Sequence, residues 1–188
     1  MAQPQEASLD RRQLVAAAFL QLEEDGLEGL SMRRLAARVN VQAPALYWHF
    51  GDKAELLGLM AREIYDTAYA AVPSANDWSE WLVLFGRALR QSFASHRDGA
   101  KLCSASQPAL ASDAAARATQ LAAPLTRLGL DEKHALACQA TVISFTLGWE
   151  LFEANGPMRD FLRQMMDFDA TFESGLAALV SGLEANAR

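Results

Sequence analysis

The chain has few of the residues that build metal and redox sites. Its 188 residues include only two cysteines and three histidines. His49, His96 and His134 lie far apart in sequence, and Cys103 and Cys138 are isolated thiols without the paired spacing of a metal motif. We therefore expect both thiols to be reduced and unbridged, and we predict no metal site.

The motifs that carry catalysis are also missing. The chain has no glycine-rich phosphate loop, no nucleophile elbow and no pair of histidines at metal-binding spacing. Its carboxylates are better interpreted as solvated faces of helices. We therefore predict that the protein is not an enzyme and that it carries no cofactor.

Long apolar runs and a signal peptide are absent as well. No run of apolar residues reaches the roughly 18 expected of a membrane span. The first eight residues lack the basic and apolar regions of a signal peptide, so we expect a cytoplasmic protein without a membrane partner. The net charge of -6 argues against a histone-like coat for nucleic acid, although a localised basic surface stays compatible with it.

No stretch alternates with the period of a strand, and no internal repeat is present. Helical periodicity runs through most of the chain instead, so the predicted fold is all-α. The expected helices cover about residues 8–25, 31–39, 43–49, 52–71, 77–93, 113–127, 131–155 and 169–185. Segment 99–112 is expected to be mainly loop, and Asp169 is expected to cap the last helix.

Residues 31–53 have the pattern of a helix-turn-helix. Ser31 is a good N-cap for a short first helix, and Asn40 tolerates the left-handed backbone that a tight corner requires. Pro44 fits only in the first turn of the second helix, which should end near His49. Because so short a helix is unstable alone, it must be held by its neighbours, and its outer face is free to bind something.

This stretch is also a basic island in an acidic chain. It holds Arg33, Arg34, Arg38 and Lys53 against a single acidic residue, Asp52. Phosphate neutralisation supplies most non-specific DNA affinity, and the start of the second helix of such a motif reaches base edges. The pattern indicates DNA binding, but helix pairs with an asparagine corner also occur in proteins that bind nothing. Both interpretations stay open at this point.

The candidate DNA contacts follow from side-chain chemistry. Small residues at the start of the second helix permit close approach, and the polar and aromatic residues around it can bond to phosphates. The candidates are Arg33, Gln42, Ala43, Pro44, Ala45, Tyr47, Trp48, His49 and Lys53. Arg11 and Arg12 either touch the sugar-phosphate backbone or form a solvated helix end.

Residues 46–50, Leu-Tyr-Trp-His-Phe, followed by Lys53, resemble the DNA-binding domain of the TetR family of bacterial repressors. The resemblance continues upstream in residues 27–31 and downstream in residues 96–101 and 145–148. It therefore spans most of the chain and does not depend on one motif.

The resemblance implies a three-helix helix-turn-helix domain at residues 1–52 and a larger helical domain for effector binding and dimerisation at residues 53–188. It implies a ligand-responsive transcriptional repressor that binds a palindromic operator in double-stranded DNA as a homodimer and is released by a small-molecule effector. The alternative is a helical binding or scaffold protein of the same fold without operator recognition.

The last two long helices are apolar over more than one stripe, and the final one mixes large residues with small ones. Small residues let helices approach closely, so two subunits could form a four-helix interface, or both helices could simply be core. A two-fold DNA site favours the dimer, as does the resemblance. The candidate dimer contacts are Trp149, Leu176, Ala178, Leu179, Gly182 and Leu183.

Aromatic side chains in the second domain indicate either a small-molecule pocket or a well-filled core, and the resemblance favours the pocket. The candidate effector contacts are Tyr69, Phe85, Leu89, Cys103, Ser106, Ser144, Phe145, Trp149 and Phe152, with Gln107 and Glu150 as further polar groups. Several of them stand where tetracycline-binding members of the family carry histidine, asparagine and glutamate ligands. We therefore expect an apolar or aromatic effector held without a metal.

Overall fold

A computed structural model describes residues 10–106 and 114–186, and all regular structure in these ranges is helical, as predicted. The helices are α1 (Arg11–Gly29), α2 (Met32–Arg38), α3 (Ala43–Leu46), α4 (Lys53–Ala71), α5 (Trp78–Ala94), α6 (Gly99–Ala105), α7 (Ala114–Thr126), α8 (Glu132–Glu153), α9 (Gly156–Leu162) and α10 (Phe168–Asn186).

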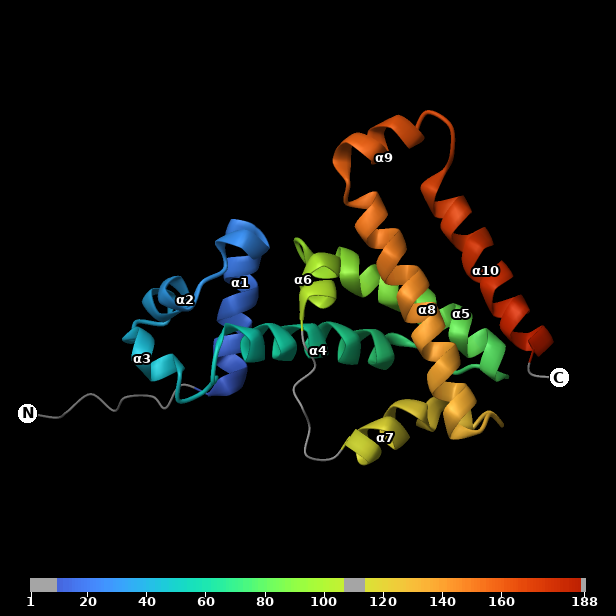
Figure 1. The fold of residues 1–188 in the computed structure, drawn as a ribbon, viewed down its shortest axis with the longest axis horizontal. Helices are drawn as coiled ribbons and strands as arrows, with labels where there is room; N and C mark the ends of the chain where they lie inside the picture. Colours follow the sequence, from blue (N-terminus) through green and yellow to red (C-terminus); the bar gives the residue numbers. More distant parts are fainter. Residues whose placement is uncertain (1–9, 107–113, 187–188) are drawn as a thin grey trace, which may run out of the picture.

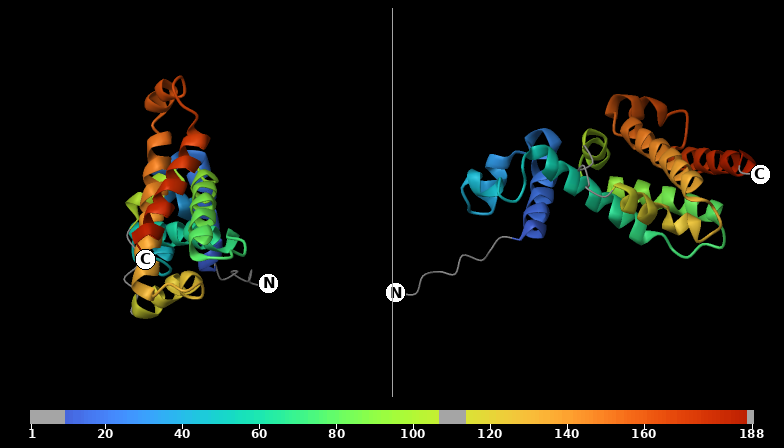
Figure 2. Two further views of the ribbon diagram at one scale, coloured as in Figure 1. Left: turned by 90° about the vertical axis from the view of Figure 1, so that its right-hand side faces the viewer. Right: turned by 60° about the horizontal axis from the view of Figure 1, so that its bottom comes forward.

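Helices α1, α2 and α3 form a group at one end of the molecule, which we call the head (Figure 1). The start of α4 packs on α1, and the same helix then runs into the rest of the protein, where it packs on α5 and α6. Figure 2 shows the head and α10 at opposite ends. Helix α4 is therefore a continuous connection between the two parts of the chain.

Most predicted helix starts are confirmed by their caps. The side chains of Asp10, Asp52, Asp77 and Asp131 each accept a hydrogen bond from a backbone N–H in the following turn. The alternative cap Ser8 lies outside the described residues. Gly26, expected to end the first helix, has a positive φ of 70° and breaks the regular helix three residues before α1 ends.

Three details correct the expectations for the second half of the chain. The segment predicted as loop contains α6, which is seven residues long and is held by the burial of Ala100, Leu102 and Cys103. The glycine–proline pair that was expected to end the helix at 131–155 instead begins α9, because proline fits the first turn of a helix, and α8 ends earlier, at Glu153. Asp167, and not Asp169, caps α10 by accepting from the N–H of Ala170 at 3.0 Å.

Helix α8 is long and rich in apolar residues, although polar residues interrupt every apolar run, as expected. By length and composition alone it is apolar enough to cross a membrane, although only 28% of its most apolar stretch is buried within the subunit. Its inner side packs on α5, α7 and α10. The residues that the structure describes leave the remaining apolar surface of α8 uncovered.

Helix α5 lies at the centre of the larger part, with Phe85, Leu89 and Phe93 almost fully buried. Gly86 lets α10 approach closely, because a Cβ there would lie 2.8 Å from both Cδ atoms of Leu176. Leu176 is itself fully buried. It is therefore a core residue of its own subunit and not the dimer contact that we expected.

The turn at residues 96–98, just before α6, fastens the head to the larger part. The Arg97 guanidinium donates to the backbone carbonyls of Glu23 at 3.2 Å and Glu24 at 2.7 Å, near the end of α1. The ring of His96 stacks on Phe19 with 4.5 Å between centroids. Residues far apart in sequence thus form a polar and aromatic contact beside the α1–α4 packing.

The same turn makes a hydrogen bond that depends on two left-handed residues. Asp98, with φ of 56°, accepts from the Leu27 N–H at 3.0 Å and from Lys101 at 2.9 Å. A Cβ on Gly26 would lie 2.9 Å from the same Asp98 carboxylate. Glycine is required at position 26 for both reasons, its positive φ and the close approach.

We predict that Asp98→Asn lowers the free energy of unfolding by about 1 kcal/mol at pH 7, because the charged acceptor is removed while shape and backbone preference are kept. Hydrogen bonds from Lys101 and from the Leu27 N–H lower the pKa of Asp98. The stabilisation is therefore complete above the unfolded value near 3.9 and disappears as the pH falls through the lower folded pKa.

Urea unfolding of both proteins between pH 7 and pH 3 measures this effect. The difference in the free energy of unfolding between the native protein and Asp98→Asn should be constant at neutral pH and should decrease in acid. The exposed control Glu63→Gln should show no such difference from the native protein. A difference that is the same at pH 3 and pH 7 would assign the effect to shape and not to charge.

Candidate DNA-binding surface and effector site

The corner of the helix-turn-helix has the predicted geometry. The Ser31 hydroxyl accepts from the Arg34 N–H at 3.3 Å and so caps α2. Asn40 adopts the left-handed conformation with φ of 55°, and the next residue, Val41, donates its N–H to the Ala36 carbonyl at 3.0 Å. The chain therefore reverses tightly between α2 and α3.

The second helix begins as predicted but is shorter. Helix α3 ends at Leu46, and the chain continues through hydrogen-bonded turns in which the N–H groups of His49 and Phe50 both donate to the Leu46 carbonyl at 2.9 Å. Leu46 and Phe50 are fully buried. These two anchors place Tyr47 and Trp48 on the outside of the head.

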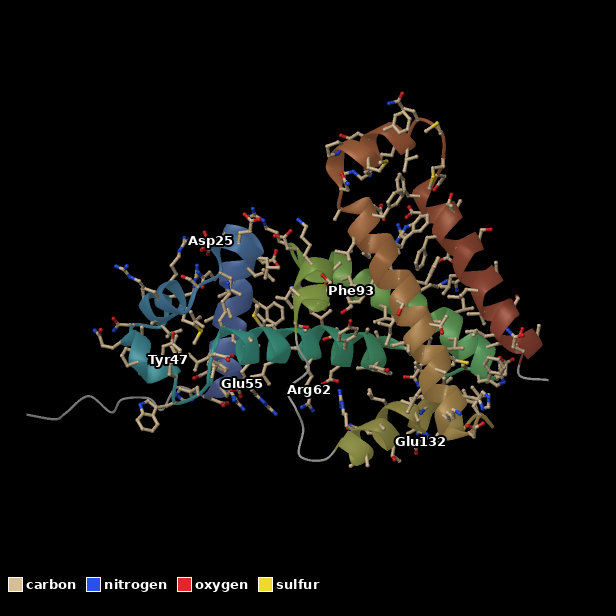
Figure 3. All side chains as sticks on the ribbon, viewed as in Figure 1. Asp25, Tyr47, Glu55, Arg62, Phe93 and Glu132 are labelled. Atoms are coloured by element: carbon tan, nitrogen blue, oxygen red, sulfur yellow. The ribbon has the colours of Figure 1, made fainter. Side chains whose placement is uncertain are left out.

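The predicted DNA contacts are accessible. Trp48 is 90% exposed and Tyr47 is 52% exposed, so both large aromatic side chains are accessible to a partner. Figure 3 shows Tyr47 on the side of the head that faces away from α8 and α10. Arg33, Gln42 and Pro44 are exposed, whereas Ala43, Ala45, His49 and Lys53 are half-buried.

Two of the four cations in residues 31–53 form ion pairs within the protein. Arg34 is paired with Asp25 at 2.9 Å, and Arg38 is paired with Glu24. Acidic residues of α1 therefore neutralise two arginines of the island, neither of which is among the candidate DNA contacts. Within the described part of the chain, Arg33 and Lys53 have no ion pair.

The arginines expected at the start of α1 also differ from each other. Arg11 pairs with Glu55 of α4 and lies 5.5 Å from the centroid of the Phe50 ring, so it fixes α1 to α4. Arg12 is exposed and has no ion pair among the residues described. Only Arg12 is therefore free to reach the sugar-phosphate backbone without breaking a contact.

The predicted effector residues separate into two groups. The first lies between α4, α5 and α6, where Tyr69 packs on Phe85 with 4.5 Å between ring centroids and donates its hydroxyl to Gln139 at 2.5 Å. Leu89 of α5 and Cys103 of α6 are buried, and Ser106 donates its hydroxyl to the Cys103 carbonyl at 3.0 Å. Burial raises the pKa of Tyr69 to about 12.

The second group is an aromatic cluster between α8 and α10. Trp149 lies 6.1 Å from Phe145, 6.3 Å from Phe152 and 6.0 Å from Phe172, measured between ring centroids. The indole Nε1 of Trp149 is buried and has no hydrogen-bond partner in the described structure. An unpaired donor among aromatic rings is a group that a ligand acceptor could satisfy.

Two further polar candidates, Ser144 and Glu150, do not join either group. Ser144 is exposed on the outer side of α8, and Gln107 lies outside the described residues. Glu150 forms an ion pair with Arg90 at 3.2 Å. The same Arg90 side chain also pairs with Glu153 at 3.0 Å. These contacts occupy Glu150 within an open cavity of about 470 Å³ between α5, α8 and α10, which the sequence did not predict.

Sequence reasoning also missed two buried polar residues of α8. Gln139 accepts from Tyr69 and donates to the Leu121 carbonyl at 2.9 Å, so it ties α4, α7 and α8 together. Thr146 is fully buried and its hydroxyl has no partner in the described structure. Both lie on the buried side of α8. Their position in the sequence, at the helical spacing of the apolar residues, could have identified them as buried polar residues.

The proposed dimer residues, apart from Leu176, remain accessible. Ala178 and Gly182 are exposed, and Leu179, Leu183 and Trp149 are half-buried. A Cβ added at Gly182 would meet no atom of the described residues within 4 Å. The outer side of α10 is therefore open to a neighbouring helix.

Two family models match the chain. Residues 14–60 match the model described as bacterial regulatory proteins, tetR family, and residues 72–160 match tetracyclin repressor-like, C-terminal domain. The tetracycline repressor protein class A from transposon 1721 of Escherichia coli is 34% identical, over 90% of this chain and 88% of its own length.

Solved structures agree with these matches. TetR(class A) in complex with 5a,6-anhydrotetracycline and magnesium is 32% identical, covers 94% of this chain and 99% of its own, and has a TM-score of 0.72. BioQ with its natural double-stranded DNA operator is 36% identical with the same coverage of both chains and a TM-score of 0.68. The chain belongs to the TetR family of DNA-binding transcriptional regulators, and it is not an enzyme.

Proposed function

We propose that the protein is a homodimeric, cytoplasmic repressor that binds a two-fold operator and releases it when a small apolar or aromatic molecule binds. The observation that carries the proposal is the exposed surface of Gln42, Tyr47 and Trp48, held outward by the buried Leu46 and Phe50. Residues 1–52 would bind DNA, and residues 53–188 would bind the effector and the second subunit.

The relatives support both halves of this proposal. BioQ is solved with its DNA operator, and TetR(class A) is solved with a tetracycline derivative. Exposed residues at the start of the second helix of a helix-turn-helix contact base edges, and dimers place two such helices on successive turns of DNA. Arg12 and Lys53, which have no ion pair among the described residues, would contact phosphate.

The dimer is supported by the outer surfaces of α8 and α10. Exposed small residues follow one side of each helix, which allows close packing against a second pair of helices. They are Ala137, Ala140, Ser144 and Gly148 on α8, and Ala177, Ala178, Ser181 and Gly182 on α10. The low burial of so apolar a helix as α8 favours a partner that covers it.

The effector proposal rests on chemistry that suits apolar molecules. Where tetracycline-binding relatives are expected to hold their ligand and metal, Phe85 and Phe152 have no donor atom, and burial raises the pKa of the Cys103 thiol to about 12. A magnesium ion requires oxygen ligands. These residues do not fit a magnesium chelate, and a flat apolar ligand beside Trp149 agrees better with them.

Two contacts would transmit effector binding to the head. The first is helix α4, which carries Tyr69 of the first effector group near its end and packs on α1 at its start. The second is the 96–98 turn before α6, which forms hydrogen bonds with α1. An effector that prefers one arrangement of α4 and α6 changes DNA affinity only by its differential affinity for the two states.

For DNA binding, we predict that Tyr47→Ala abolishes operator binding, because a two-fold complex would be without this side chain in both half-sites. Lys53→Ala should weaken binding to all sequences and lower the salt slope by roughly one unit for each phosphate that the protein no longer neutralises. Titrations of labelled DNA at several salt concentrations measure both effects, with exposed Lys133→Ala on α8 as the charge-matched control.

Footprinting near the protein's own gene tests the operator itself. Absence of a protected two-fold site, together with mobility shifts that ignore sequence, would favour a scaffold protein of this fold over a repressor.

For assembly, we predict that Gly182→Arg or Ala178→Arg gives monomers, because a bulky charge fills the close helix contact while leaving the subunit's own packing intact. Light scattering at micromolar concentration measures the mass, and Ala71→Arg, at an exposed site on α4, is the control. A native protein that is monomeric under these conditions would contradict the dimer.

For the effector, we predict that apolar aromatic compounds quench the fluorescence of Trp149 and lower DNA affinity together, without added magnesium. The chain has four tryptophans, so the change assigned to Trp149 must be missing in Trp149→Phe. Tight, magnesium-dependent binding of tetracycline would show the metal-free proposal to be wrong.

A further inference from the structure

Glu55, in the first turn of α4, contacts two other segments of the head. One carboxylate oxygen accepts the N–H of Gly51 at 2.7 Å. Gly51 and Asp52 form the link between the buried Phe50 and α4, and we call these two residues the link. The other carboxylate oxygen forms an ion pair with Arg11, at the start of α1. Figure 3 shows Glu55 close to the beginning of α1. One side chain of α4 therefore joins the link to α1.

The link is fixed by hydrogen bonds and not by burial. Gly51 and Asp52 are both exposed. Phe50, directly before the link, is fully buried and donates its N–H to the Leu46 carbonyl. Asp52 caps α4 by accepting from the Glu55 N–H at 2.8 Å. The hydrogen bond from Gly51 to Glu55 therefore restricts how the chain leaves Phe50 and enters α4.

Arg11 orients the Glu55 carboxylate from the α1 side. Its guanidinium lies 5.5 Å from the centroid of the Phe50 ring, which is a cation–π distance, while it pairs with Glu55. Because the ion pair is partly exposed, it should contribute little to the free energy of unfolding. Its effect is geometric instead, since it points the carboxylate toward the N–H of Gly51.

On charge alone, Glu55 is unfavourable for DNA binding. It lies two residues after Lys53, which we expect to contact phosphate, and a carboxylate repels the DNA backbone. Charge alone therefore predicts that Glu55→Gln strengthens binding to every DNA sequence.

We propose that Glu55 is a positioning residue for operator binding, which holds the link together with Arg11 so that Tyr47 and Lys53 keep a fixed spacing. This rests on the proposed operator function. Tyr47 lies before the link and Lys53 after it, so a change in the link alters the distance between them. Non-specific binding depends on phosphate neutralisation and tolerates such a change. Operator binding does not, because phosphate contacts fix the register in which bases are read.

Titrations of the full-length protein test the proposal with two duplexes of equal length. One carries the operator selected from a random double-stranded DNA pool, and the other carries its scrambled sequence. Glu55→Gln should leave the affinity for the scrambled duplex equal or higher, because a negative charge is removed. It should lower the ratio of operator to scrambled affinity roughly 5- to 30-fold, the range expected for one charged hydrogen bond.

Arg11→Met tests the partner of Glu55. It keeps an apolar side chain near Phe50 but removes the ion pair, so the affinity ratio should fall by a similar factor. The double variant with Glu55→Gln should fall little further, because both changes remove the same contact. Glu28→Gln, at an exposed site on α1 of the head, is the matched control and should leave the ratio unchanged.

The signs of the two effects separate positioning from simpler causes. An equal rise in affinity for both duplexes would leave only the charge effect and overturn the inference. Equal weakening of both would show a folding defect instead, and purely additive losses in the double variant would show that Glu55 and Arg11 act separately.

The native protein separates this inference from the function beneath it. If it selects no two-fold site, the operator proposal fails and the positioning role fails with it. If it selects such a site and Glu55→Gln leaves the affinity ratio unchanged, only the positioning role fails.

Discussion

The burial of Leu46 and Phe50 is the constraint on which the proposed DNA surface depends. Helix α3 has four residues, far fewer than the roughly 12 to 15 that an isolated helix needs to be stable in water. Its shape is therefore imposed by the two fully buried side chains at its end, both joined through the Leu46 carbonyl. The exposed aromatic residues between them are positioned by the core and not by the helix that carries them.

The head is held to the larger part by packing on one side and by polar contacts on the other. Helix α4 joins the two parts continuously, whereas the 96–98 turn contacts the end of α1 through the Arg97 and Asp98 side chains. The polar contacts can break and re-form at modest cost, because most of them lie near solvent. The head is therefore attached both by a continuous helix and by polar contacts near solvent.

Local signals in the sequence were enough for the helices, the corner and most caps, because Asn40, Pro44 and the capping aspartates act on their immediate neighbours. Helix α6 was missed because its stability comes from burial of residues 100–103 in a core built by distant helices. The same limit explains the burial of Leu176 and the ion pairs of Arg34 and Arg38. Whether a leucine faces its own core, or an arginine meets an acid, depends on tertiary contacts.

The sparse burial of α8 affects how readily a newly made subunit is degraded. A lone chain with a membrane-like helix on its surface presents the kind of apolar patch that chaperones and proteases bind. If a second subunit covers that helix, association also protects the chain from degradation. The dissociation constant of the pair would then set how much protein survives at low synthesis rates, so cellular abundance would rise more steeply than the rate of translation.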